Sequence, residues 1–220
     1  MRFRNRADAG RWLAKGLRPF VASGPDLLIL GLPRGGVPVA WEVAQYYRAP
    51  LDVFLVRKLG APDQPELAIG AIATGGTRVL NHDALLQLSI TLREVEQITE
   101  RERRELDRRE RAYRDDAPPL GLTQKTVVLV DDGLATGSTM RAAILAARTQ
   151  SPRRIIVGVP TASPIVCSML ATIADDVVSV LTPEPYQAVG AWYDDFRQVT
   201  DEEVKRILDR ARESYPRQGA

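Results

Sequence analysis

Short, unbroken runs of apolar residues alternate with stretches of helical periodicity along most of the chain. An apolar run without polar alternation is typical of a strand buried on both faces of a parallel sheet. Such runs occur at 26–31, 51–57, 127–130, 154–159 and 177–181. Helical patterns occupy 5–20, 38–47, the stretch from Met140 and the stretch after Ser163. This alternation predicts an α/β fold with a parallel sheet.

The middle of the chain follows a different pattern. Gly75 and Gly76 separate two apolar runs, which predicts a β-hairpin. Thr91 and Glu94 have the spacing of a capping box, and they open a predicted helix that ends near Tyr113. Both signs of charge recur along that helix at i,i+4 spacing. We therefore interpret it as a solvated helix supported by ion pairs rather than as an RNA-binding element.

We interpret 1–220 as one domain without internal repeats. The predicted core covers about 23–60 and 120–182, an insertion covers about 61–119, and a small lobe combines 1–22 with 183–220. Asn5 is a candidate N-cap for the first helix. Thr200 and Glu203 form a second capping-box pattern at the start of the last helix.

Composition narrows the class of protein. The 220 residues are 45% hydrophobic and 26% charged, and the net charge of +2 is too small to indicate a nucleic-acid partner. No stretch approaches the ~18 apolar residues that span a bilayer, and the start of the chain lacks the apolar segment of a signal peptide. The single cysteine, Cys167, cannot form an internal disulfide. We therefore expect a cytoplasmic protein without a membrane partner.

The residues Val127 to Thr139, VVLVDDGLATGST, carry the strongest chemical signal. Asp131 and Asp132 follow a predicted buried strand, and open α/β sheets bind ligands at the carboxyl ends of their strands. Small residues then run into a helix, so that backbone N–H groups and hydroxyls can surround an anion. Two carboxylates would repel a bare phosphate, but they suit the vicinal hydroxyls of a ribose, or a Mg²⁺ ion held through water.

Other kinds of site fit the sequence less well. There is no GxGxxG after the first strand and no GxxxxGK[ST], which argues against a dinucleotide site and a P-loop. His82 is the only histidine, with no cysteine near it and no nucleophile elbow to accompany it, which argues against a zinc site and a serine hydrolase. The remaining alternative is an ordinary strand-to-helix turn with two chance carboxylates.

The stretch resembles the signature of the type I phosphoribosyltransferases, which use 5-phosphoribosyl-1-pyrophosphate (PRPP). The resemblance implies a Rossmann-like core with a small hood lobe, Mg²⁺ as cofactor and, as is usual among related enzymes, a homodimer. It assigns the ribose hydroxyls to Asp131 and Asp132, which would hold the metal through water and not directly. It assigns the 5-phosphate of PRPP to Ala135, Thr136, Gly137, Ser138 and Thr139.

Two positions depart from the family pattern. Gly133 stands where an aliphatic residue is usual, a change that adds backbone freedom. Ala135 stands where 6-oxopurine enzymes have the aspartate that handles the proton of the base, which argues against hypoxanthine or guanine as the acceptor. Proton transfer then needs another group. Glu66, in a stretch flanked by prolines, is our candidate catalytic acid or base.

Two short basic segments are candidates for binding pyrophosphate. Arg34, Gly35 and Gly36 follow the first strand, where the family binds pyrophosphate, often with an unusual cis peptide bond. The glycines let the backbone approach an anion, and the arginine can donate to two of its oxygens. Arg57 and Lys58 end the second predicted strand at the same sheet edge, where charges fit a polyanion. The alternatives are a tight turn with a surface arginine, and side chains that reach past the sheet into solvent.

The segment Val189–Arg197, VGAWYDDFR, resembles the hood that covers the base in purine phosphoribosyltransferases. Trp192 or Tyr193 would offer a stacking face to a planar base, and Arg197 would add to the pyrophosphate contacts. The alternative is that Trp192, Tyr193 and Phe196 pack the lobe onto the core.

The predicted function is PRPP-dependent, Mg²⁺-assisted transfer of a 5-phosphoribosyl group to a nitrogenous acceptor, a nucleobase or similar heterocycle, with release of pyrophosphate. An alternative of another class is a regulatory protein that senses PRPP or a nucleotide with little turnover, and that binds RNA through the arginine-rich helix. A third is a hydrolase that releases ribose phosphate. Beyond the signature, the order of LPRGGVPVA, LDVFLVRKLGAP, ELAIGAIA and VDDGLATGST is similar to that of bacterial phosphoribosyltransferase-like proteins.

Overall fold

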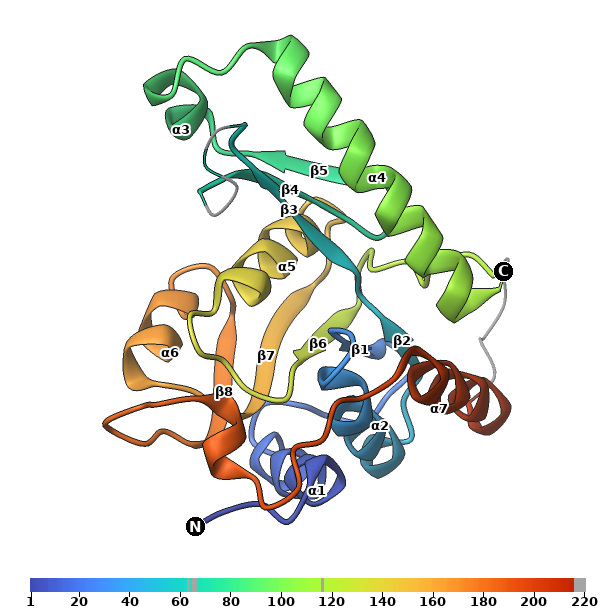
Figure 1. Cartoon of the computed structure of the whole chain (residues 1–220). Helices are drawn as coiled ribbons and strands as arrows, with labels where there is room; N and C mark the ends of the chain where they lie inside the picture. The colour runs from blue at the N-terminus through green and yellow to red at the C-terminus, as the bar shows by residue number, and fades with distance from the viewer. Residues whose placement is uncertain (63, 65–66, 116, 216–220) are drawn as a thin grey trace.

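The computed structural model describes residues 1–62, 64, 67–115 and 117–215 of the chain. Within these residues the centre is a parallel sheet of five strands, which confirms the predicted fold class. The strands are β1 (Leu27–Gly31), β2 (Leu51–Val53), β6 (Thr126–Val130), β7 (Arg154–Thr161) and β8 (Asp176–Leu181). They lie in the order β2-β1-β6-β7-β8 (Figure 1). The direction of the strand order reverses between β1 and β6, and doubly wound sheets bind their ligands at such a reversal.

Helices cover both faces of this sheet. One face is covered by α1 (Arg6–Gly16), α2 (Gly36–Tyr47) and α7 (Asp201–Ser214), and the other by α5 (Ser138–Arg148) and α6 (Pro164–Leu170) (Figure 1). Neighbouring strand residues enter different apolar clusters: Ile29 and Val128 belong to the first, and Leu28 and Leu129 to the second. The strands lack polar alternation because both of their faces are buried.

A second, smaller sheet is antiparallel and lies beside the first (Figure 1). It consists of β3 (Val56–Gly60), β4 (Ala68–Ala73) and β5 (Thr77–Leu80), and it is followed by α3 (His82–Gln87) and α4 (Leu92–Arg114). The turn between β4 and β5 contains Gly75 and Gly76 at φ values of 83° and 75°, so the predicted hairpin is confirmed. α5 contacts all three strands and thereby joins the two sheets.

The prediction of a single strand at 51–57 is wrong. β2 ends at Val53, and β3 begins at Val56 in the other sheet. The chain crosses at Leu55, whose N–H donates to the Thr74 hydroxyl over 2.9 Å and whose carbonyl accepts from the Thr74 N–H over 2.9 Å. Phe54 and Leu55 are as deeply buried as a strand interior. The apolar run therefore continues through the crossing and does not reveal the change of sheet.

Most helix starts follow the predicted caps. Asn5 accepts from the N–H of Asp8, and Thr91 forms both halves of the capping box with Glu94. Two helices begin two residues earlier than the sequence predicts, α2 at Gly36 and α5 at Ser138. These early starts bring both helix N-termini close to the sheet edge where β1 and β6 end.

α4 carries the charge pairs that its sequence predicts. Glu105 contacts Arg108 and Arg109, each over 2.8 Å, on the exposed side of the helix. The last residue, Arg114, is instead buried, and its Nε lies 3.0 Å from the Asp52 carboxylate of β2. Across the described ranges, none of the helices is long and apolar enough to cross a membrane.

Candidate functional site

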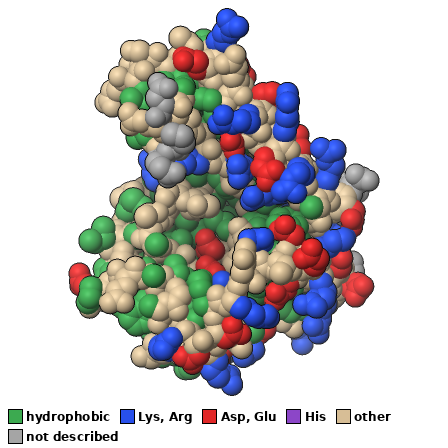
Figure 2. Space-filling view, viewed as in Figure 1, with side chains coloured by type: hydrophobic (Ala, Val, Ile, Leu, Met, Phe, Trp, Pro, Cys, Tyr) green, Lys and Arg blue, Asp and Glu red, His purple; other side chains and the backbone are tan. Residues whose placement is uncertain are grey.

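The loops that follow β1 and β6 meet at the reversal of strand order. The N–H of Leu32 donates to the Val130 carbonyl over 2.8 Å. A Cβ atom on Gly35 would lie only 1.9 Å from Oδ2 of Asp132, and one on Gly36 would lie 2.5 Å from the Val130 carbonyl oxygen. Both positions therefore require glycine for this approach of the two loops. Figure 2 shows acidic side chains in the hollow between the two parts of the molecule.

The loop after β1 has the backbone feature that the family resemblance implies. The Pro33–Arg34 peptide bond is cis. The Arg34 side chain is exposed, and its Nη1 lies 3.9 Å from Oδ1 of Asp201, the first residue of α7. The same oxygen accepts from the Tyr113 hydroxyl of α4. Arg34 is thus accessible to an anion at the edge where β1 ends.

Asp131 and Asp132 lie at the carboxyl end of β6, as predicted. Oδ1 of Asp131 accepts from the N–H of Asp132 over 2.8 Å. Burial and the neighbouring carboxylate of Asp132 raise the pKa of Asp131 well above its ordinary range. An acid with a strongly raised pKa at a ligand-binding edge is a candidate functional residue.

Asp132 has a partner that the sequence analysis missed. Its Oδ2 accepts from Nε of Arg6 in α1 over 2.8 Å, and Nη2 of the same guanidinium also lies 2.8 Å from it. Its backbone carbonyl accepts from the Tyr193 hydroxyl over 2.5 Å. Burial raises the pKa of Asp132, and the Arg6 guanidinium opposes that rise. Arg6 is 126 positions away in the sequence, and no local pattern connects the two residues.

The residues from Ala135 to Thr139 form the turn into α5. Gly137 is the N-cap residue with a φ of 71°, and a Cβ atom there would lie 2.7 Å from Val166. The Thr136 and Ser138 hydroxyl oxygens are 2.6 Å apart. Every residue in this turn except Gly137 is exposed. Exposed hydroxyls at the N-terminus of a helix are the arrangement that binds a phosphate group.

Arg57 and Lys58 do not lie at the edge of the parallel sheet, which corrects the sequence prediction. Both are in β3 of the antiparallel sheet. The guanidinium of Arg57 contacts Glu102 of α4, with Nε 2.9 Å from Oε2, while Lys58 is exposed. The argument that these charges close a strand beside the acid pair is therefore wrong, because that strand ends at Val53.

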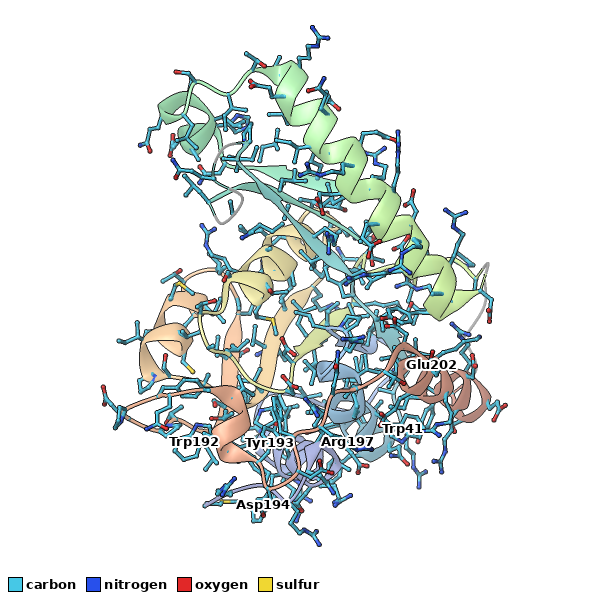
Figure 3. The ribbon with its side chains drawn as sticks, viewed as in Figure 1. Trp41, Trp192, Tyr193, Asp194, Arg197 and Glu202 are labelled. Atoms are coloured by element: carbon cyan, nitrogen blue, oxygen red, sulfur yellow. The ribbon has the colours of Figure 1, made fainter. Side chains whose placement is uncertain are left out.

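The segment with Trp192 and Tyr193 folds back against the N-terminus (Figure 3). Tyr193 is 1% exposed, and its ring centroid lies 5.5 Å from that of Phe3 and 5.0 Å from that of Phe196. Its ring faces are covered and cannot stack on a base. Tyr193 therefore packs the lobe onto the core, which is the alternative given in the sequence analysis. Trp192 is half-buried, and its carbonyl accepts from the N–H of Phe3 over 2.8 Å.

Tyr186, in the same lobe, is a candidate that the sequence analysis did not select. It follows β8, and its hydroxyl donates to the carbonyl of Thr161, at the end of β7, over 3.5 Å. Burial raises its pKa, and the charges of Asp132 and Asp131 add to the rise, so the ring lies within electrostatic range of the acid pair. Its ring is half-buried rather than covered. A lone tyrosine in a loop gives no sequence signal for such a position.

The structure gives a physical reason for the unusual Gly133. A Cβ atom at this position would lie 2.5 Å from a methyl group of Val189 and 3.1 Å from one of Thr161. The hood residue Val189 occupies the space that a side chain at 133 would need. Gly133 is not among the residues with positive φ, so the close contact with Val189 and not a left-handed backbone accounts for a glycine here.

The structure adds little support for a functional role of the three remaining residues, Glu66, His82 and Cys167. Glu66 lies outside the described residues, so its proposed role is a prediction only. His82 is the first residue of α3, and the described part of the chain contains no cluster of three side chains able to hold a metal directly. Cys167 in α6 is partly buried and packs against the second apolar cluster.

Comparisons with a family model and with related proteins point to the same family. The model of the phosphoribosyl transferase domain matches residues 4–166. Two proteins of Mycobacterium tuberculosis, from strains CDC 1551 and H37Rv, are each 43% identical over 218 residues and carry the provisional name phosphoribosyl transferase. The match covers 99% of this chain but 49% of each relative, so the chain spans about half the length of these proteins.

A solved structure agrees with the fold. The crystal structure of the protein TT1426 from Thermus thermophilus superposes with a TM-score of 0.86 at 45% sequence identity. The alignment covers 94% of this chain and 98% of that one.

Proposed function

The chain belongs to the phosphoribosyl transferase family, and on this basis we propose that it transfers the 5-phosphoribosyl group of PRPP to a nitrogenous acceptor, a nucleobase or similar heterocycle, and releases pyrophosphate. One observation carries the proposal. Three features meet at the reversal of strand order: the acid pair Asp131 and Asp132, the hydroxyl-lined N-terminus of α5, and the loop after β1 that contains Gly35 and Gly36, here called the glycine loop.

Each part of PRPP has a matching group in this arrangement. The exposed hydroxyls of Thr136 and Ser138 and the start of α5 suit the 5-phosphate. The carboxylates of Asp131 and Asp132 suit the ribose hydroxyls as acceptors. Arg34 and the backbone beside Gly35 suit the pyrophosphate, which is the leaving group.

The acid pair also fits the proposed Mg²⁺. Carboxylate oxygens are the donors that this ion prefers, and it commonly keeps several of its waters. Burial and the neighbouring Asp132 carboxylate raise the pKa of Asp131, so a nearby cation would favour its ionised form. Asp131 and Asp132 would hold the ion through water, and the ion would supply positive charge to the departing pyrophosphate.

In the proposed reaction the acceptor nitrogen forms a bond to C1 of the ribose while the bond from C1 to the pyrophosphate oxygen breaks. Positive charge develops on the sugar ring and negative charge on the leaving group. The chain would contribute alignment through Asp131 and the α5 turn, and charge neutralisation through Arg34. Ala135 offers no group for the proton of the acceptor, so Glu66 stays our proposed catalytic residue for that proton.

Tyr186 and Trp192 are the hood side chains that we propose for contact with the acceptor. Both are half-buried, whereas Tyr193 is covered.

A homodimer in the cytoplasm remains part of the proposal. Light scattering on the purified chain would measure its mass in solution.

Calorimetry with PRPP and Mg²⁺, followed by pyrophosphate release with a panel of nucleobases, tests the proposal. PRPP binding and base-dependent release are the expected results. Binding without release for any base would favour the sensor instead. Release without an acceptor would favour the hydrolase. An absence of PRPP binding would reject the PRPP-dependent functions together.

A further inference from the structure

Arg6 is the first residue of α1, and its side chain is largely covered, with 11% of its surface exposed. Arg4 and Arg11 are the arginines before and after it in the sequence, and their side chains are 75% and 50% exposed. Arginine is seldom buried without a partner that uses its planar donors. The burial of Arg6 therefore calls for a specific role that the family assignment does not provide.

All of the guanidinium nitrogens of Arg6 are engaged. Nε donates to Oδ2 of Asp132 over 2.8 Å, and Nη2 lies 2.8 Å from the same oxygen. Nη1 donates to the backbone carbonyl of Arg197 over 2.8 Å. The guanidinium carbon lies 4.1 Å from the ring centroid of Phe196. One side chain thus joins α1, the acid pair and the hood segment.

The Asp132 carboxylate also contacts the glycine loop. Its carboxylate lies so close to Gly35 that a Cβ atom there would be 1.9 Å from Oδ2. The Tyr193 hydroxyl holds its backbone carbonyl, as described above. The carboxylate is consequently enclosed between Arg6 and the glycine loop, and its position depends on both.

We propose that Arg6 is a positioning residue for PRPP: it fixes the Asp132 carboxylate against the glycine loop and ties the hood segment to the acid pair, so that α1 forms part of the ribose site. This inference rests on the proposed function. A buried carboxylate without its guanidinium loses its counter-charge and its orientation together. The hood segment loses its link to the acid pair at the same time, through the carbonyl of Arg197 and the ring of Phe196.

The test is the affinity for PRPP, measured by calorimetry in the presence of Mg²⁺, of the wild type and the variants Arg6→Ala, Arg6→Lys and Arg11→Ala. We expect Arg6→Ala to bind PRPP roughly tenfold or more weakly. Arg6→Lys should recover part of the loss, because it keeps the charge but not the planar donors. Arg11→Ala is the matched control on the same helix. It removes only exposed contacts to Glu42 and Asp8, and it should bind like the wild type.

A second measurement separates positioning from a general role in folding. Methylguanidinium added to Arg6→Ala should restore PRPP affinity by occupying the vacated space, and it should leave the wild type unchanged. Unchanged or stronger PRPP binding by Arg6→Ala would overturn the inference. So would a loss that neither lysine nor methylguanidinium reverses, because Arg6 would then serve only the folding of α1. If the wild type itself binds no PRPP, the proposed function fails, and this inference fails with it.

Discussion

The two sheets of this protein are stabilised in different ways. In the parallel sheet, β1 is buried at every position and β7 at all but its first, and their residues are almost entirely apolar. In the antiparallel sheet, β5 has no buried residue and β3 has one. The helix that covers the second sheet, α4, is rich in exposed ion pairs. Apolar burial thus dominates the first sheet, and a mixture of burial and charge pairing supports the second.

This difference matches the distribution of the candidate site. The acid pair, the turn into α5 and the glycine loop all follow strands of the parallel sheet. Rigid, buried strands hold loops in fixed positions, which a binding site requires. The antiparallel part is attached at the Leu55 crossing, through α5, and through Arg114 at the end of α4. Its attachment should therefore be separable from the integrity of the site.

The largest expected effect tests that attachment. Arg114 and Asp52 are 2% and 1% exposed, and Arg114 also donates to the Val53 carbonyl over 2.6 Å. Arg114→Met removes the counter-charge of the buried Asp52 carboxylate, and we expect a loss of about 3 to 5 kcal/mol in the free energy of unfolding. Urea unfolding measures it. Arg104→Gln, on the exposed side of the same helix, is the control. Equal stability of the two variants would show that the buried pair does not hold α4.

A smaller effect is expected where the two loops of the parallel sheet touch. Gly35→Ala forces a methyl group against the Asp132 carboxylate, and the displacement should cost about 1 to 3 kcal/mol of stability. PRPP affinity should fall with it, because Asp132 must move. Gly24→Ala adds the same methyl group where nothing lies within 4 Å, and it serves as the control. Chemical denaturation and PRPP calorimetry give the comparison. A Gly35→Ala variant that matches Gly24→Ala in both would contradict the close approach of the loops.

Neutral substitution of Asp131 should stabilise the fold. The pKa of Asp131 is raised in the folded protein, so its ionisation destabilises the fold at neutral pH, and Asp131→Asn should raise the free energy of unfolding there. This destabilisation builds up as the pH rises from the pKa of Asp131 in the unfolded chain to its pKa in the folded protein. At a pH below both values, Asp131→Asn should no longer be more stable than the wild type. Thermal unfolding of the variant and the wild type at neutral and acid pH measures this gain. Destabilisation by Asp131→Asn would contradict the assignment.

The smallest effect concerns the exposed face of α4. Arg108 and Arg109 lower the pKa of Glu105 to about 2. A lowered carboxyl pKa stabilises the fold above the unfolded value near 4.5, and this contribution disappears as the pH falls toward 2. Because the pairs are exposed, Glu105→Gln should lose only about 0.5 kcal/mol at neutral pH. Urea unfolding at neutral pH and near pH 2 would detect it. If the two proteins still differ in free energy of unfolding near pH 2, the charge of Glu105 is not the cause of the stability loss.

Local patterns were sufficient for much of the fold. The capping residues Asn5 and Thr91, the hairpin at Gly75 and the buried strands follow from rules that act over a few positions. The acid pair and the turn into α5 could be selected for the same reason, because the signature is contiguous and its position after a strand fixes the sheet edge.

The failures of prediction depend on tertiary contacts. The run at 51–57 crosses from one sheet to the other without losing its apolar character, so Arg57 and Lys58 were assigned to the wrong edge. Arg6 was missed because its partner, Asp132, is far away in the sequence. Residues that act through such long-range contacts can be found only once the chain is folded.

The central claim is that Asp131, at the end of β6, binds the ribose of PRPP. Calorimetric titration of PRPP with Mg²⁺ into the wild type and into Asp131→Asn tests it most directly. We predict saturable binding to the wild type and binding roughly ten- to a hundredfold weaker to the variant, because a charge-assisted hydrogen bond is lost. Equal affinities of the two proteins, with the variant fully folded, would contradict the account.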